Sequence, residues 1–191
     1  MGLSAGGCLR GLFQSLGGFM NAKIGSVVNW FGRVYLGGIP QLIRDETAFL
    51  SFVCMLAGIE ALGGYWNPDA SGPGANGERF RGFVATYFPE AYRPLADALW
   101  DFRNGMTHGF SPRRFVLTHH SSSLHFAKTR DGATILNAED FYAAFLHAAQ
   151  AYFVDLAQSP QLQEKFLRRL ESPTGGSFAV GFVDVIDENP A

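Results

Sequence analysis

Residues that can move protons or bind phosphate are concentrated in one part of this 191-residue chain. Four of its five histidines fall between His108 and His125, and residues 101–130 hold five Lys or Arg side chains against one acid, Asp101. The formal net charge of the whole chain is −2. A local excess of positive charge attracts phosphate groups, whereas the low net charge excludes a protein that is basic over its entire surface.

The most specific pattern in this segment is an arginine followed five residues later by a histidine. Arg103 and His108 stand near the end of a stretch with helical periodicity, and Asn104 follows the arginine directly. A histidine can transfer a proton near neutral pH, and an arginine offers fixed donors to a phosphate. The same spacing occurs at Arg114 and His119, but those residues lie on an expected strand, so the helical context favours the first pair.

The stretch from Arg103 to His108 resembles the R-x4-6-H motif of the HEPN superfamily, helical-bundle proteins that include many RNA-cleaving toxins and defence nucleases. In that family a polar residue often follows the arginine, and Asn104 is similar in this respect. The resemblance is strongest over residues 90–110 and extends weakly over 41–171. It implies a mainly α bundle like those of bacterial HEPN-like proteins, and a homodimer in which two motifs face each other and form one cleft.

The resemblance also implies RNA binding and metal-independent cleavage of RNA, with Arg103, His108 and Asn104 as catalytic residues. Five further side chains are expected to hold RNA: Arg113, Arg114, Lys128, His119 and His120. Glu60 and Asp101 are expected to support the arginine. No cofactor and no metal is expected, the expected location is the cytoplasm, and the sequence identifies no antitoxin partner.

Two other functions stay open from the sequence. A non-catalytic HEPN-like module that dimerises or binds a ligand or partner fits the same motif, because Arg103 can pair with Glu60 or Asp101 and His108 can bond a loop carbonyl. A helix on a membrane surface is the second alternative. Residues 1–44 contain four basic residues and no acid, a composition that suits anionic lipid.

A zinc site at His119, His120 and His125 is a further alternative, although no Cys or acid is close to these histidines in sequence. The two cysteines, Cys8 and Cys54, are far apart and form no CxxC pair. They therefore predict neither a disulfide framework nor a cysteine-bound metal, and they suit a reducing compartment.

A long helix over 41–63 is expected to form the centre of the fold. Asp45 and Glu46 would lie in its first turn, and the following surface is apolar on nearly every side. The strongest apolar run, Thr47 to Ile59, is too short for a membrane span of ~20 residues and indicates a core helix. Glu60, a carboxylate near the end of this helix, needs a cationic partner if it is buried.

The pattern changes to period two between about 113 and 136. Three segments are expected as strands, 115–117, 124–128 and 134–136, with a turn at residues 121–123 between the first two. Asp131 and Gly132 form a strong hairpin signal between the last two. We therefore expect a mainly α fold with a small antiparallel β-meander inserted at about 113–136.

The chain divides into three expected parts. Residues 1–40 form a Gly-rich, basic amphipathic extension, and residues 41–172 form the HEPN-like helical domain. Residues 173–191 form an acidic tail with one added strand from Phe178 to Ile186. No repeat and no second domain is visible in the sequence.

Overall fold

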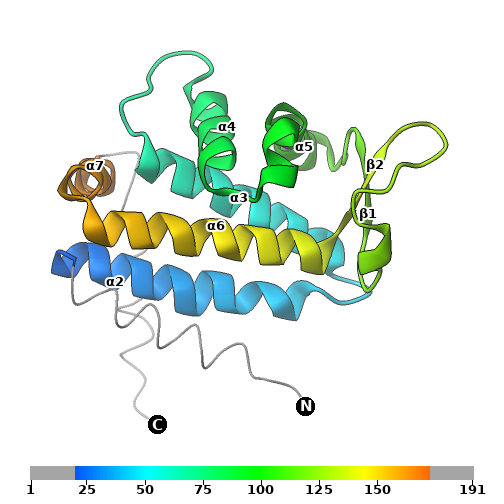
Figure 1. Cartoon of the computed structure of the whole chain (residues 1–191), viewed down its shortest axis with the longest axis horizontal. Coiled ribbons are helices and arrows are strands. Elements are labelled where there is room, and N and C mark those ends of the chain that lie inside the picture. The colour runs from blue at the N-terminus through cyan, green and yellow to red at the C-terminus, as the bar shows by residue number, and fades with distance from the viewer. Residues whose placement is uncertain (1–19, 173–191) are drawn as a thin grey trace, which may run out of the picture.

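The computed structural model describes residues 20–172, and the apolar helix α3 (Ala48–Trp66) lies at their centre (Figure 1). α3 contacts α4, α5, α6 and α7. By length and composition alone it would suffice to cross a membrane, but 56% of its most apolar window is buried inside the protein. The expected core helix is therefore present, although it begins at Ala48 and not near residue 41.

Helices make up most of the described residues. The longer ones are α2 (Ala22–Trp30), α3 (Ala48–Trp66), α4 (Ala75–Tyr87), α5 (Ala96–Gly109), α6 (Ala138–Gln158) and α7 (Pro160–Glu171). The shorter ones are η1 (Phe31–Leu36), η2 (Ile39–Leu42), η3 (Glu90–Leu95) and η4 (Ser122–Leu124). The two strands are β1 (Phe115–Thr118) and β2 (Thr134–Asn137). The expected mainly α fold is thus confirmed.

The described part of the expected N-terminal extension belongs to the helical core. α2 continues into the π-helical segment η1, and Ile24, Val28 and Leu36 are fully buried. The ring of Phe31 packs edge-on against Phe153 of α6. The buried apolar side chains of residues 20–40 thus belong to the same hydrophobic core as those of the other described helices. Residues 1–19 lie outside the described residues.

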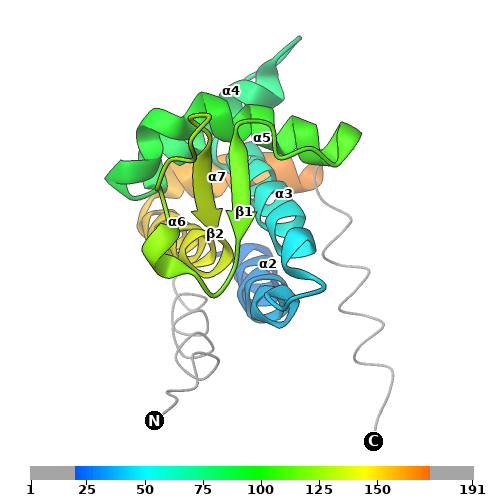
Figure 2. The same cartoon turned by 90° about the vertical axis from the view of Figure 1, so that its right-hand side faces the viewer.

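The expected antiparallel meander is wrong, because the two strands are parallel (Figure 2). β1 pairs with β2 in a register that runs from Phe115 opposite Thr134 to Thr118 opposite Asn137. A parallel pair needs a long crossover, and residues 119–133 supply it.

The segment expected as the middle strand, 124–128, forms part of this crossover. It still bonds to β2 in the antiparallel sense: the N–H of Phe126 donates to the carbonyl of Ile135 at 2.8 Å, the N–H of Ile135 donates to the carbonyl of Ala127 at 2.9 Å, and Lys128 forms a bridge with Thr134. Phe126 has a positive φ of 65° and packs edge-on against Tyr92, with ring centroids 4.8 Å apart. The segment therefore pairs with β2 over a short stretch but departs from a regular strand at Phe126. The other strand expected outside the helices, 178–186, lies outside the described residues.

A tight loop joins α5 to β1 and brings the basic residues back over the helix. Phe110 ends α5 in the left-handed conformation, and the N–H of Ser111 donates to the carbonyl of Gly105 at 3.1 Å. A Cβ at Gly105 would collide with the Ser111 carbonyl and lie 2.7 Å from Cγ of Arg113. Only glycine lets the loop lie this close, so Gly105 sets the place of Arg113.

Candidate functional site

Arg103 is held inside its own subunit by an ion pair with Glu60. Its Nη2 contacts Oε2 of Glu60, and the two side chains are only 21% and 20% exposed. The guanidinium carbon lies 5.5 Å from the ring centroid of Trp100, and Nη1 donates to Oδ1 of Asn104 at 3.2 Å. Arg103 is thus the cationic partner that Glu60 requires on an apolar helix.

The two side chains expected to form the catalytic pair do not meet within one subunit. Five residues along an α-helix separate two side chains by about 140° around the axis, so His108 points away from the face that carries Arg103. His108 is exposed in the last turn of α5. Within residues 20–172 it forms no hydrogen bond or ion pair, whereas Arg103 is engaged on several sides.

Asn104, unlike Arg103, lies on the same face of α5 as His108. The two residues are four positions apart and share one face of α5. Asn104 lines a cleft of about 570 Å³ together with four other residues: Asp101, Ser111, Arg113 and Arg114. Because its carbonyl oxygen accepts from Arg103, its NH₂ group is the part left to serve the cleft.

A second cleft of about 550 Å³ adjoins the first, and Arg113 and Arg114 line both. Among its other lining residues are Lys128, whose Nζ donates to Oγ1 of Thr134 at 2.6 Å, and two acids, Asp97 and Asp131. Arg113 and Arg114 are exposed, and neither forms an ion pair within the described residues.

The two clefts are mixed in charge rather than uniformly basic. They contain three basic side chains, on Arg113, Arg114 and Lys128, and three acids, Asp97, Asp101 and Asp131. One of the acids, Asp97, is paired with Arg81 of α4 at 3.4 Å. The excess of positive charge in residues 101–130 is therefore offset in space by two acids from outside this segment, Asp97 of α5 and Asp131 of the turn before β2.

His119 and His120, expected to hold RNA, line neither cleft. They follow β1 at the end opposite Arg113 and Arg114. Nε2 of His119 faces Oδ1 of Asp45 at 3.7 Å, and Nδ1 of His120 contacts Oε1 of Glu139 at 2.6 Å. Neither acid is near the histidines in sequence, so no local motif signals these contacts.

His125 lies apart from the other two histidines of the expected zinc site, with both ring nitrogens engaged. Nδ1 accepts the N–H of Asn137 at 3.1 Å, so in the neutral ring Nε2 carries the proton and donates to the hydroxyl oxygen of Tyr92 at 2.8 Å. Tyr92 in turn donates to the carbonyl of Asp140 at 3.3 Å. Desolvation lowers the pKa of His125, and the charge of Asp140 opposes this only in part.

No protein-family model, curated protein or solved structure matches this chain. The HEPN resemblance therefore depends on the Arg103–His108 motif, and function has to be argued from this site. The structure brings Arg103, Asn104 and Glu60 into contact. Asn104 and Asp101 both line the first cleft. The structure places His108 outside the residues that line this cleft.

The lowered pKa of the partly buried His125 predicts a pH dependence of stability. Since its folded pKa lies below the ordinary value of 6.5, the unfolded chain binds a proton that the folded protein does not as pH falls through this range. The free energy of unfolding should therefore decrease between about pH 7 and pH 5, and His125→Gln should lose this component. Urea unfolding of both proteins at pH 7 and pH 5 measures this change in the free energy of unfolding.

The matched control for this measurement is His147→Gln, since His147 is exposed on α6. It should show the same loss of stability at low pH as the wild-type protein. An equally large loss in His125→Gln would contradict the assignment.

Proposed function

We propose that the protein binds the sugar–phosphate backbone of RNA across the two clefts that meet at Arg113 and Arg114. The observation that carries the proposal is that these exposed arginines line both clefts while forming no ion pair within residues 20–172. The aliphatic part of the Arg113 side chain packs against Gly105, which fixes where this arginine lies. Guanidinium groups that are not held in an ion pair keep their donors for phosphate.

The mixed charge of the clefts favours a polynucleotide over a bare phosphate. Phosphate oxygens need donors, which Arg113, Arg114 and the NH₂ group of Asn104 supply. Ribose hydroxyls and base amino groups need acceptors, and the carboxylates of Asp101 and Asp131 supply these. The 2′-OH can donate to such an acceptor, which gives a means of distinguishing RNA from DNA.

In this proposal Arg103 is a positioning residue and does not contact RNA. Its ion pair with Glu60 fixes the guanidinium, and the guanidinium fixes the amide of Asn104. The amide then presents its two N–H groups to the cleft. This role differs from the phosphate contact that the motif resemblance implies, because both terminal nitrogens of Arg103 already have partners, Nη2 in Glu60 and Nη1 in Asn104.

Metal-independent RNA cleavage is a second candidate, favoured by the place of His108. His108 is exposed, one helical turn beyond Asn104 on the same face. It can accept the proton of a ribose 2′-OH while that oxygen attacks phosphorus and the bond to the 5′-oxygen breaks, which leaves a 2′,3′-cyclic phosphate. The leaving 5′-oxygen takes a proton from His108 of a second copy, as the dimer implied by the resemblance allows.

RNA affinity at several salt concentrations tests the binding proposal. We expect Arg113→Ala and Arg114→Ala each to weaken binding of a single-stranded RNA about tenfold, and each to lower the slope of log K against log salt by about 0.7. DNA of the same sequence should bind more weakly than RNA. Fluorescence anisotropy with a labelled oligonucleotide measures both quantities.

Arg168→Ala is the charge-matched control for this experiment. Arg168 is exposed on α7, which lies at the opposite end of the described structure from β1 (Figure 1), and it pairs with the exposed Asp69. Its removal should leave the affinity nearly unchanged. A wild-type protein that does not bind RNA, or equal losses in all three variants, would overturn the proposal.

Incubation of RNA with the protein in EDTA tests the second candidate separately. Wild type should release products with a cyclic phosphate, and His108→Ala should lower the rate by about 10² to 10⁴. His147→Ala, another exposed histidine, should leave the rate unchanged. RNA binding without cleavage, or equal rates in all proteins, would reject the catalytic role and leave the binding function.

A further inference from the structure

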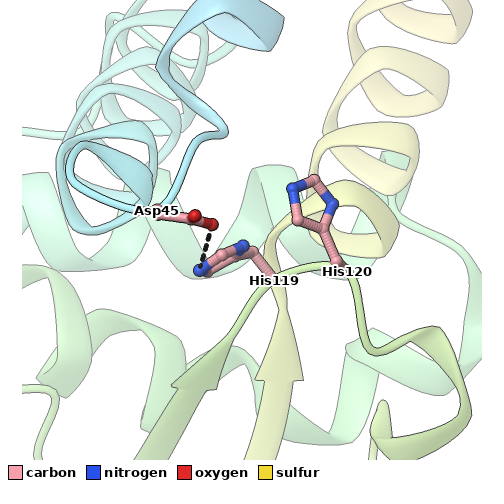
Figure 3. Close-up of side chains that lie close together, drawn as sticks. All are labelled: Asp45, His119 and His120. Carbon is pink, nitrogen blue, oxygen red and sulfur yellow. Dashed lines mark ion pairs between the residues drawn. The ribbon is translucent and has the colours of Figure 1, made fainter.

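Three potential metal ligands from distant parts of the chain converge at the end of β1. Asp45 lies in the turn before α3, and His119 and His120 follow β1 directly. One ligand atom from each of the three lies within 4.8 Å of the others. Figure 3 shows the carboxylate of Asp45 facing the ring of His119, with the ring of His120 beside them.

A carboxylate outside this group orients His120. Oε1 of Glu139 contacts Nδ1 of the ring at 2.6 Å, and its carboxylate also accepts the backbone N–H of His120 at 3.0 Å. The residue is held in the left-handed conformation with φ of 54°. With Nδ1 bonded to Glu139, Nε2 is the nitrogen left to bind a ligand. A carboxylate that fixes the second nitrogen is typical of metal-bound histidine.

His119 has one nitrogen in a position to bind. Nδ1 is buried and has no hydrogen-bond partner within the described residues. Nε2 faces Asp45 at 3.7 Å, which is longer than a hydrogen bond. The two groups therefore face each other without a direct hydrogen bond. The side chain of His119 is 27% exposed and that of Asp45 is 88% exposed.

We propose that Asp45, His119 and His120 bind a divalent transition-metal ion, with Zn²⁺ the best match to two imidazole nitrogens and one carboxylate oxygen. Water completes the coordination, and Glu139 stays outside it as the partner of His120. Ligand atoms around a tetrahedral zinc ion lie ~3.4 Å apart. The exposed side chain of Asp45 can rotate to close the remaining gap.

This site is separate from the clefts proposed to bind RNA and goes beyond that function. Arg114 directly precedes β1 and His119 directly follows it, so the five steps between them span about 17 Å by the rise of a strand. A bound ion would join the turn before α3 to the start of the crossover between β1 and β2. Because such an ion binds only the folded chain, it should raise the melting temperature.

Zinc titration of the full-length protein, treated first with a chelator, tests the proposal. Wild type should bind one Zn²⁺ per chain at the site, and Asp45→Asn, His119→Ala and His120→Ala should each lower the affinity at least tenfold. Co²⁺ in place of Zn²⁺ should give visible absorption bands that these variants lose. Since Asp45 is mostly exposed, its substitution tests the site without affecting the fold.

Glu139→Gln and two histidine controls distinguish a metal site from simple ion pairs. Glu139→Gln should bind Zn²⁺ about 10- to 100-fold more weakly, because His120 loses its orienting carboxylate. His108→Ala and His147→Ala, at other exposed histidines, should bind like wild type. If Asp45→Asn and His119→Ala also bind Zn²⁺ like wild type, these residues form ion pairs and no metal site, and the proposal is wrong. The proposal is also wrong if all histidine variants lose the same affinity for Zn²⁺.

Discussion

The ion pair between Glu60 and Arg103 is the constraint on which the candidate site depends. Glu60 is a carboxylate on the most apolar helix of the described structure, and a mostly buried charge requires a partner. Arg103 supplies it from α5, and this contact sets how α5 is rotated about its own axis against α3. The next residue, Asn104, then faces the cleft, and His108 lies one turn further along the same face.

The loop after α5 and the strand β1 carry the remaining groups. Gly105 lets residues 111–113 lie against the helix, so that Arg113 and Arg114 form the boundary between two clefts. β1 pairs in parallel with β2 and ends at the two histidines, which meet Asp45 from the turn before α3. One short strand thus separates a surface suited to phosphate from a cluster suited to a metal ion.

Sequence patterns predict the parts of this structure that depend on local composition. All-round apolarity identifies α3 as the core helix, and the isolated carboxylate of Glu60 predicts a cationic partner. The pattern in 124–128 predicts the antiparallel bonds that this segment makes with β2, but it does not predict the left-handed backbone of Phe126, which interrupts a regular strand. The role of Arg103 and the contact between Asp45 and His119 depend on residues that are far apart in sequence. Motif spacing therefore cannot predict them.

The most direct test of this account is a double-mutant cycle between Glu60 and Arg103, measured by urea unfolding of Glu60→Gln, Arg103→Gln and the double variant. We expect a coupling free energy of about 1–3 kcal/mol, because both side chains are mostly shielded from water. The exposed pair of Lys23 and Glu171, 67% and 61% exposed, should give less than about 0.5 kcal/mol in the same cycle. A coupling between Glu60 and Arg103 no larger than this would contradict the account, since Arg103 would then be free to act elsewhere.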